Sequence, residues 1–159
     1  MLKWLGENSS KLVRLSVQGG EPFLQREFFE MMDYIETLDN PELELTVNSN
    51  LNADTEVFEK FIPRIRKMLV ERRIKRFDFT ASIDCWGPEQ EFVRYGLDLG
   101  RWQRNFEYIL QHKWLYITAG HAITSLSIGT MAKMQEVLNK YMEQGNRINQ
   151  TFHYVDGPY

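Results

Sequence analysis

Cysteine is almost absent from this sequence, because Cys85 is the only one among 159 residues. A single cysteine cannot form an internal disulfide and cannot build a metal site from cysteine thiolates. The sequence also lacks any apolar run near the ~20 residues that a membrane-spanning helix needs, and its first residues show no signal-peptide pattern. We therefore expect a cytoplasmic protein that does not bind membranes.

A large excess of charge of one sign is missing as well. The formal net charge is −3, which argues against binding to nucleic acid driven by electrostatics. Glycine, proline and serine are not concentrated anywhere, so neither a linker nor a disordered tail is indicated. With 43% hydrophobic residues the chain has enough apolar material for a core, and we expect residues 1–159 to form a single domain.

One local group of positive charges stands out against this balance. Because most of the group falls at the end of a predicted helix, where the helix dipole favours cations, we interpret it as a solvated helix end rather than a nucleic-acid site. The residues are Arg64, Arg66, Lys67, Arg72, Arg73, Lys75 and Arg76.

Strand-like and helix-like patterns alternate along the chain. Apolar alternation predicts strands over residues 12–18, 43–47, 76–83, 115–118 with 122–124, and 152–155. Helical spacing predicts helices over residues 25–38, 55–72, 89–113 with a break at 96–100, and 130–143. Asp54 is expected to cap the second of these helices and Pro63 to kink or split it. The alternation predicts an α/β fold with parallel strands, either a βα-barrel or a doubly wound sheet.

The most informative motif is Gly19-Gly20-Glu21-Pro22, which lies where the first predicted strand turns into a helix. Adjacent glycines permit positive φ and a close approach of the backbone to a ligand, while Pro22 fixes the exit angle of the chain. In parallel α/β sheets and barrels, ligands bind at this edge. The alternative reading is a tight turn that only connects the strand to the helix.

Polar residues follow the next two predicted strands in the same way. Asn48 and Asn50 come after the second strand, and Ser82 and Asp84 after the third, with Arg94 twelve residues beyond Ser82. Each has a simpler interpretation: Asn is a common turn residue, Ser82 can satisfy local backbone groups, and Asp84 can cap the next helix. Arg94 can pair with an acidic neighbour, Glu89 or Glu91, on its own helix.

In this order and placement, these motifs resemble radical S-adenosylmethionine (SAM) enzymes over residues 10–159. The resemblance extends to Gly87-Pro88, residues 92–97, Trp102 and Asn105, a pattern similar to radical SAM proteins with a C-terminal twitch or SPASM extension. It implies an α/β fold that is a partial (βα)6-type barrel. It also implies an activity in which a 4Fe-4S cluster cleaves SAM to a 5′-deoxyadenosyl radical that abstracts hydrogen from a substrate.

The resemblance also implies roles for individual residues. Gly19, Gly20, Glu21 and Pro22 would receive the amino group of SAM through backbone acceptors. Ser82 and Arg94 would hold its carboxylate, Asn48 and Asn50 would contact the ribose or the methionyl group, and Asp84 would accept from a ribose hydroxyl. Relatives of this type act on peptides or small metabolites, so a peptide substrate and a reductant protein are the expected partners.

The sequence departs from the family at its defining feature, because the Cys-x-x-x-Cys-x-x-Cys loop that ligates the cluster is absent. We therefore expect the cluster ligands, the first βα unit and the C-terminal extension to lie outside this chain, and no catalytic or metal-binding residue within it. The alternative hypothesis is a non-catalytic α/β module that binds a nucleotide-like ligand or a protein partner.

Overall fold

A parallel five-stranded sheet organises the computed structural model, which describes residues 2–8 and 11–155. The strands follow the order β1-β2-β3-β4-β5, so β1 and β5 are the edges, and every neighbouring pair is parallel. Their bounds are β1 Arg14–Val17, β2 Glu44–Ser49, β3 Arg76–Ser82, β4 Tyr116–Ile123 and β5 Ile148–Tyr154. This confirms the predicted α/β class with parallel strands.

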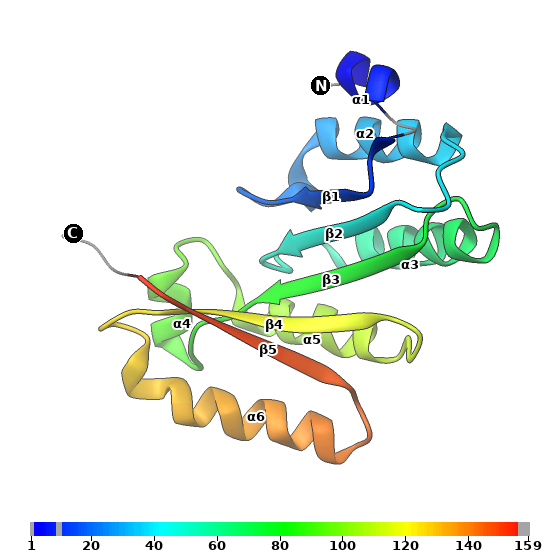
Figure 1. Cartoon of the computed structure of the whole chain (residues 1–159). Coiled ribbons are helices and arrows are strands. Elements are labelled where there is room, and N and C mark those ends of the chain that lie inside the picture. The colour runs from blue at the N-terminus through cyan, green and yellow to red at the C-terminus, as the bar shows by residue number, and fades with distance from the viewer. Residues whose placement is uncertain (1, 9–10, 156–159) are drawn as a thin grey trace.

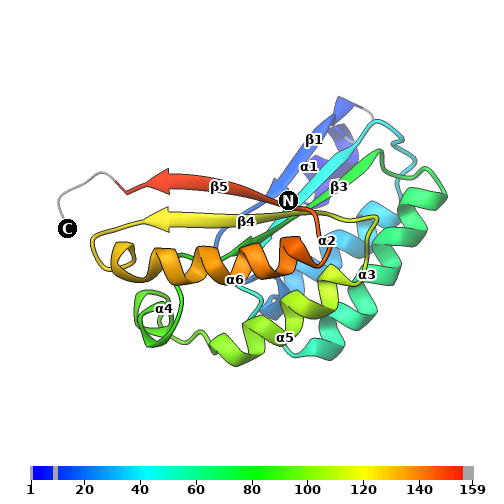
Figure 2. The ribbon, with the colours of Figure 1, turned by 90° about the horizontal axis from the view of Figure 1, so that it is seen from below.

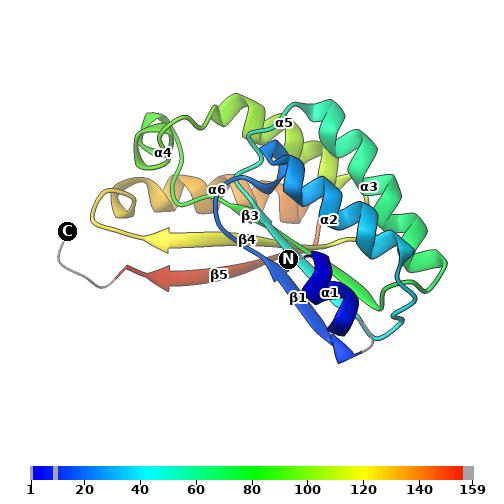
Figure 3. The same ribbon diagram turned by 90° about the horizontal axis from the view of Figure 1, so that it is seen from above.

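Helices occupy the connections between the strands. They are α1 Leu2–Asn8, α2 Arg26–Thr37, α3 Thr55–Val70, α4 Pro88–Val93, α5 Leu99–Leu110 and α6 Met131–Glu143, with short 3-10 turns η2 Pro22–Leu24 and η3 Ile128–Thr130. Figures 2 and 3 show α2, α3, α5 and α6 on one face of the twisted sheet, with no helix over the centre of the other face. In the described residues no helix is long and apolar enough to cross a membrane.

The alternation of burial along the strands agrees with helices that cover only one face of the sheet. Buried side chains alternate with half-buried ones along β2, β3 and most of β4, and the register places buried Val47, Phe79 and Ile117 side by side. The intervening residues of these strands are largely polar and face away from the helices. Each strand therefore has an apolar helix side and a polar open side.

An aromatic cluster fills the space between the sheet and helices α2 and α3. Phe23 lies near its centre, with its ring centroid 4.6 Å from that of Phe58, 4.9 Å from Phe61, 5.1 Å from Phe28 and 5.9 Å from Phe79. Phe23 is the residue directly after Pro22, and only 2% of it is exposed. The motif at the end of β1 is thus anchored in the core by its next side chain.

Helix α3 is continuous through Pro63, so the predicted split into two helices is wrong. Phe58, Ile62 and Ile65 are buried against the core, while Pro63 is exposed on the outer side of the helix. The carbonyl that loses its helical partner there, that of Glu59, lies one turn earlier and is open to water. Asp54 occupies the N-cap position of the helix, as expected, but its side chain makes no capping hydrogen bond.

Strands β4 and β5 are longer than their apolar patterns predict. The structure joins the two predicted pieces of β4 through Ala119, Gly120 and His121. A Cβ at Gly120 would lie 3.0 Å from Cγ2 of Thr80, so the strand is tightly packed where its apolar pattern lapses. β5 begins at Ile148, four residues before the predicted start, because its polar residues 149–151 continue the sheet ladder without alternating apolar side chains.

Asn105 fastens helix α5 to the loop between β2 and α3, and we expect its removal to destabilise the fold. The side chain is fully buried, donates to the carbonyls of Leu51 and Ala53 at 2.8 Å each, and accepts from the Thr55 hydroxyl at 2.7 Å. Asn105→Ala leaves these buried groups without partners, so the free energy of unfolding in guanidinium should fall by about 2–4 kcal/mol. The exposed neighbour Arg104→Ala serves as a control and should change it by less than about 0.5 kcal/mol. Equal stability of the two variants would contradict this role.

Candidate functional site

The loop after β1 has the backbone that its glycines predict. Gly19 has φ 92° and Gly20 has φ 60°, both in the region that side chains with a Cβ rarely adopt. Pro22 then opens the 3-10 turn η2, in which the carbonyls of Glu21 and Pro22 accept the N–H groups of Leu24 and Gln25. The carbonyls of Gly19 and Gly20 take no part in that turn.

Glu21 holds this loop against the end of β2. Its Oε1 accepts from the Ser49 hydroxyl at 2.7 Å, and its Oε2 accepts from the Asn50 N–H at 2.6 Å. Burial raises the pKa of Glu21 above its ordinary value of 4.5, and the hydrogen bonds from Ser49, Asn50 and the Phe23 N–H lower it in part. Both oxygens already have protein partners, so this carboxylate holds the loop in place.

Arg94 and Asp84 form the centre of the site. The Arg94 guanidinium donates to both oxygens of Asp84, at 2.7 Å from Nε and 2.9 Å from Nη2, and its Nη1 donates to Asn50 Oδ1 at 2.6 Å. Asp84 is 2% exposed and also accepts from the Ala122 N–H at 2.7 Å. The expected alternatives, Arg94 paired with Glu89 or Glu91 and Asp84 as a helix cap, are both wrong.

The turn between β3 and α4 is fixed by a residue that the sequence did not point to. Gln90 is fully buried, and its Oε1 accepts from the N–H groups of Asp84 and Cys85 at 3.0 Å each. This pair of bonds orients the backbone that carries Asp84. A glutamine inside a short helix has no distinguishing pattern, so only the folded geometry identifies it.

Asn48 and Ser82 lie on the open face of the sheet, next to this network. Asn48 is opposite Thr80 in the β2–β3 register, and Ser82 is opposite Gly120 in the β3–β4 register. Both side chains are half-buried. The structure thus brings Glu21, Asn50, Asp84 and Arg94 into one hydrogen-bonded chain and places Asn48 and Ser82 at its margin.

Cys85 is unsuited to bind a metal ion or cluster. It is fully buried, its Sγ lies 3.6 Å from Oε1 of Gln90, and burial raises the pKa of the thiol. Across residues 2–8 and 11–155, no group of three or more His, Cys, Asp or Glu side chains is arranged to hold a metal ion.

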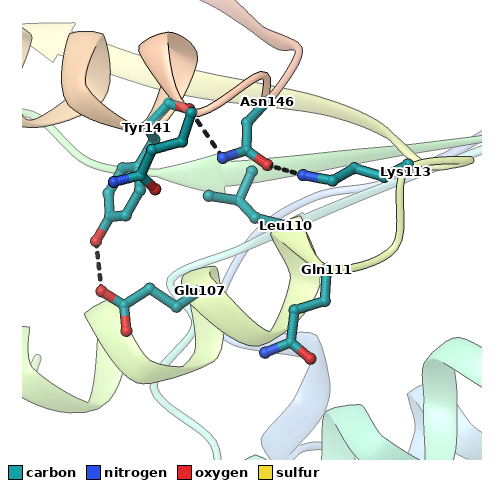
Figure 4. A pocket seen from close by; sticks show the side chains of 7 residues that line it. Glu107, Leu110, Gln111, Lys113, Tyr141 and Asn146 are labelled. Atoms are coloured by element: carbon teal, nitrogen blue, oxygen red, sulfur yellow. Dashed lines mark hydrogen bonds between the residues drawn. The ribbon is translucent and has the colours of Figure 1, made fainter.

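A cavity of about 520 Å³ lies away from this network, between the ends of α5 and α6 (Figure 4). Tyr141 Oη donates to Glu107 Oε1 at 2.7 Å across it, and Asn146 bonds both Lys113 and the Tyr141 carbonyl. Burial raises the pKa of Tyr141, so its hydroxyl stays protonated as a donor. These bonds tie α5 to α6 and account for the polar side chains there.

No family model matches this chain, and no curated protein or solved structure matches it. The chemistry of the site therefore rests on its own geometry. In that geometry, polar groups from β1 to β4 lie together at the carboxyl ends of these strands.

Because burial raises the pKa of Glu21, we expect this residue to make the fold less stable as the pH rises. The folded state binds the proton more tightly than the unfolded chain, so stability is lost as pH increases from 4.5 through the raised pKa. The unfolding free energy of the wild type relative to Glu21→Gln should thus fall as the pH rises above 4.5 in guanidinium titrations. A difference that grows with pH would show that the hydrogen bonds to the carboxylate outweigh its burial.

Proposed function

We propose that this chain is the SAM-binding core of a radical SAM enzyme, folded as part of a (βα)6-type barrel. The main support is the hydrogen-bonded chain Glu21–Asn50–Arg94–Asp84, which links the ends of β1, β2, β3 and β4. Ligands of open and barrel-like α/β sheets bind at this edge, above the carboxyl ends of the strands. The uncovered polar face beside it would be the inner wall of the barrel.

The residues present suit the amino-acid part of SAM. An ammonium needs acceptors, and the carbonyls of Gly19 and Gly20 are the ones that the turn η2 leaves over. A carboxylate needs donors: a guanidinium has five N–H groups, of which Arg94 uses three in the bonds to Asp84 and Asn50. The remaining N–H groups of Arg94 and the hydroxyl of Ser82 would hold it.

Two further roles concern the ribose of SAM and the positioning of Arg94. Asn48 would contact the ribose, because its side chain lies on the open face. Asp84 already accepts from Arg94 and Ala122, so we assign it the positioning of Arg94 in place of a ribose contact.

The chain's own residues do not fit a 4Fe-4S cluster, since its only cysteine is buried against Gln90. In this proposal the cluster ligands lie outside these 159 residues, and the chain's part is to bind and orient SAM. A reductant protein and a substrate, with a peptide as the expected class, complete the reaction.

The same cysteine count favours a second candidate, a non-catalytic module that binds SAM or another nucleotide-like ligand. Anaerobic purification of the protein from its source cells separates the two. A 4Fe-4S spectrum, with release of 5′-deoxyadenosine from SAM on reduction, would support the enzyme. SAM binding with neither signal would support the module.

Ser82→Ala should weaken SAM binding without unfolding the protein, because Ser82 is half-buried on the open face. Loss of one hydroxyl bond corresponds to about 0.5–1.5 kcal/mol, so the Kd from equilibrium dialysis should rise about two- to tenfold. The control is Thr46→Ala, which alters the same face nearer the start of β2 and should leave the Kd unchanged. Absence of SAM binding by the wild type, or equal effects of both variants, would overturn the assignment.

A further inference from the structure

Strand β5 forms one edge of the sheet, and its outer side has no partner strand. It pairs with β4 alone, and among the described residues no other strand lies beyond it (Figures 2 and 3). All but the first of its seven residues are half-buried or exposed, including Phe152 at 45% and Tyr154 at 75%. An edge strand of this kind presents a row of backbone groups with which another strand can pair.

The backbone groups that face outward belong to every second residue of β5. The N–H and C=O of one strand residue point to the same edge, and those of the next residue point to the opposite edge. The Val155 N–H donates to the Ile123 carbonyl of β4 at 3.2 Å, and the register is continuous from there back to Ile148. Residues 149, 151 and 153 therefore bond to β4. The backbone groups that face the outer edge are those of Ile148, Gln150, Phe152 and Tyr154.

β5 lacks the features that protect edge strands from pairing. Edge strands are commonly very short, or carry charged side chains, proline or a bulge. The opposite edge follows this rule, since β1 has only four residues and includes the exposed Arg14. β5 has seven residues in continuous register with β4, and it contains no Lys, Arg, Asp, Glu or Pro. Charge therefore does not oppose the approach of a second, uncharged strand.

The side chains of β5 divide between the two faces of the sheet. Ile148 lies opposite Ile117, which is buried on the helix side, so the even-numbered residues of β5 face that side. The odd-numbered residues face the open side, where Thr151 lies opposite Gly120. The helix side of β5 thus carries both aromatic rings, and the open side carries only polar side chains: Asn149, Thr151 and His153.

The strand is complementary to itself when two copies pair antiparallel about a two-fold axis at Thr151. This axis places outward-facing residues of one copy opposite outward-facing residues of the other along the whole strand, so that each such pair exchanges both N–H···O bonds. No like charges are opposed, and Thr–Thr and aromatic–β-branched pairs stabilise antiparallel strands. The opposed residues are Ile148 with Tyr154, Gln150 with Phe152, Asn149 with His153, and Thr151 with its own copy.

We propose that two copies of this chain associate through β5, which joins their two five-stranded sheets into one continuous sheet. A single pair of strands is a small interface, so the association is weak and depends on concentration. It is independent of the SAM-binding proposal, because it uses the outer edge of β5. The proposed SAM contacts come from residues 19–94.

Charges placed on the two-fold axis give the sharpest test. Thr151 is exposed, so Thr151→Lys and Thr151→Glu leave the fold intact, but each brings two like charges together across the axis. In sedimentation velocity over about a hundredfold range of concentration, the wild type should shift from one chain to two. Either variant alone should associate at least about fivefold more weakly. An equal mixture of the two should associate at least as strongly as the wild type, because opposite charges then meet.

The matched control is Ser16→Lys, which adds the same charge at an exposed position on the other edge strand, β1. It should leave the association unchanged. Amide hydrogen exchange locates the interface: the outward N–H groups of Gln150, Phe152 and Tyr154 should exchange faster in Thr151→Lys than in concentrated wild type. The N–H groups of residues 149, 151 and 153, which face β4, should be protected in both.

A wild type that stays a single chain at every concentration would overturn the proposal. Equal effects of Thr151→Lys and Ser16→Lys would do so as well, because the contact would then lie on another surface, and so would a mixture of the two Thr151 variants that fails to associate. A single chain whose outward β5 amides are nevertheless protected would show that another segment of the same chain covers this edge, and it too would overturn the proposal.

Discussion

The buried carboxylate of Asp84 is the group on which the arrangement of the candidate site depends. It lies just beyond the end of β3, 2% exposed, where an unpaired negative charge would be strongly unfavourable. Arg94 and the Ala122 N–H satisfy it, and in doing so they bring the end of α4 and the end of β4 to β3. The pairing therefore sets both the direction of the Arg94 guanidinium and the spacing of the strand ends. Through Arg94 Nη1 it extends to Asn50, and from there to Glu21.

Packing in the aromatic core also fixes the position of the loop that carries Glu21. Within a few residues the chain passes from Glu21, which faces the polar network, to Phe23, whose ring is surrounded by Phe28, Phe58, Phe61 and Phe79. The glycine turn cannot shift without moving a ring that packs on four others, and dense packing makes such a shift costly. Loop geometry at the site is thus fixed by burial of a neighbouring side chain as much as by the bonds of the loop itself.

The sequence predicted the alternation of strands and helices and the glycine turn, because these depend on local spacing and on backbone limits. It did not predict the partner of Arg94. Local spacing offered Glu89 or Glu91 as an alternative partner, but α4 ends at Val93, and Arg94, with φ −111° and ψ 77°, leaves the helix. Its side chain then meets Asp84, ten positions earlier, a contact that exists only once the β3–α4 turn is formed by Gln90. β5 was predicted too short because its first residues are polar. Hydrogen bonds to β4 keep these residues in a strand, and an apolar pattern in the sequence cannot reveal such pairing.

The parallel topology itself separates two kinds of chemistry. Every strand ends at the edge that carries the Asp84 network, and α2, α3, α5 and α6 begin nearer that edge and end nearer the other (Figure 1). Helix N-termini favour negative charge and C-termini favour positive charge, which agrees with carboxylates braced at one end of the sheet and arginines and lysines gathered at the other. The polarity is general to such folds, and what is particular to this chain is how each end uses it. At the strand ends the charges are paired and buried among themselves, which gives a rigid frame. At the strand starts the cations are more exposed, and they pair with carboxylates at the surface, Arg14 with Glu44, Lys75 with Glu42 and Arg76 with Asp78, so solvent screens these pairs and they hold the fold less firmly than the buried pair at the strand ends.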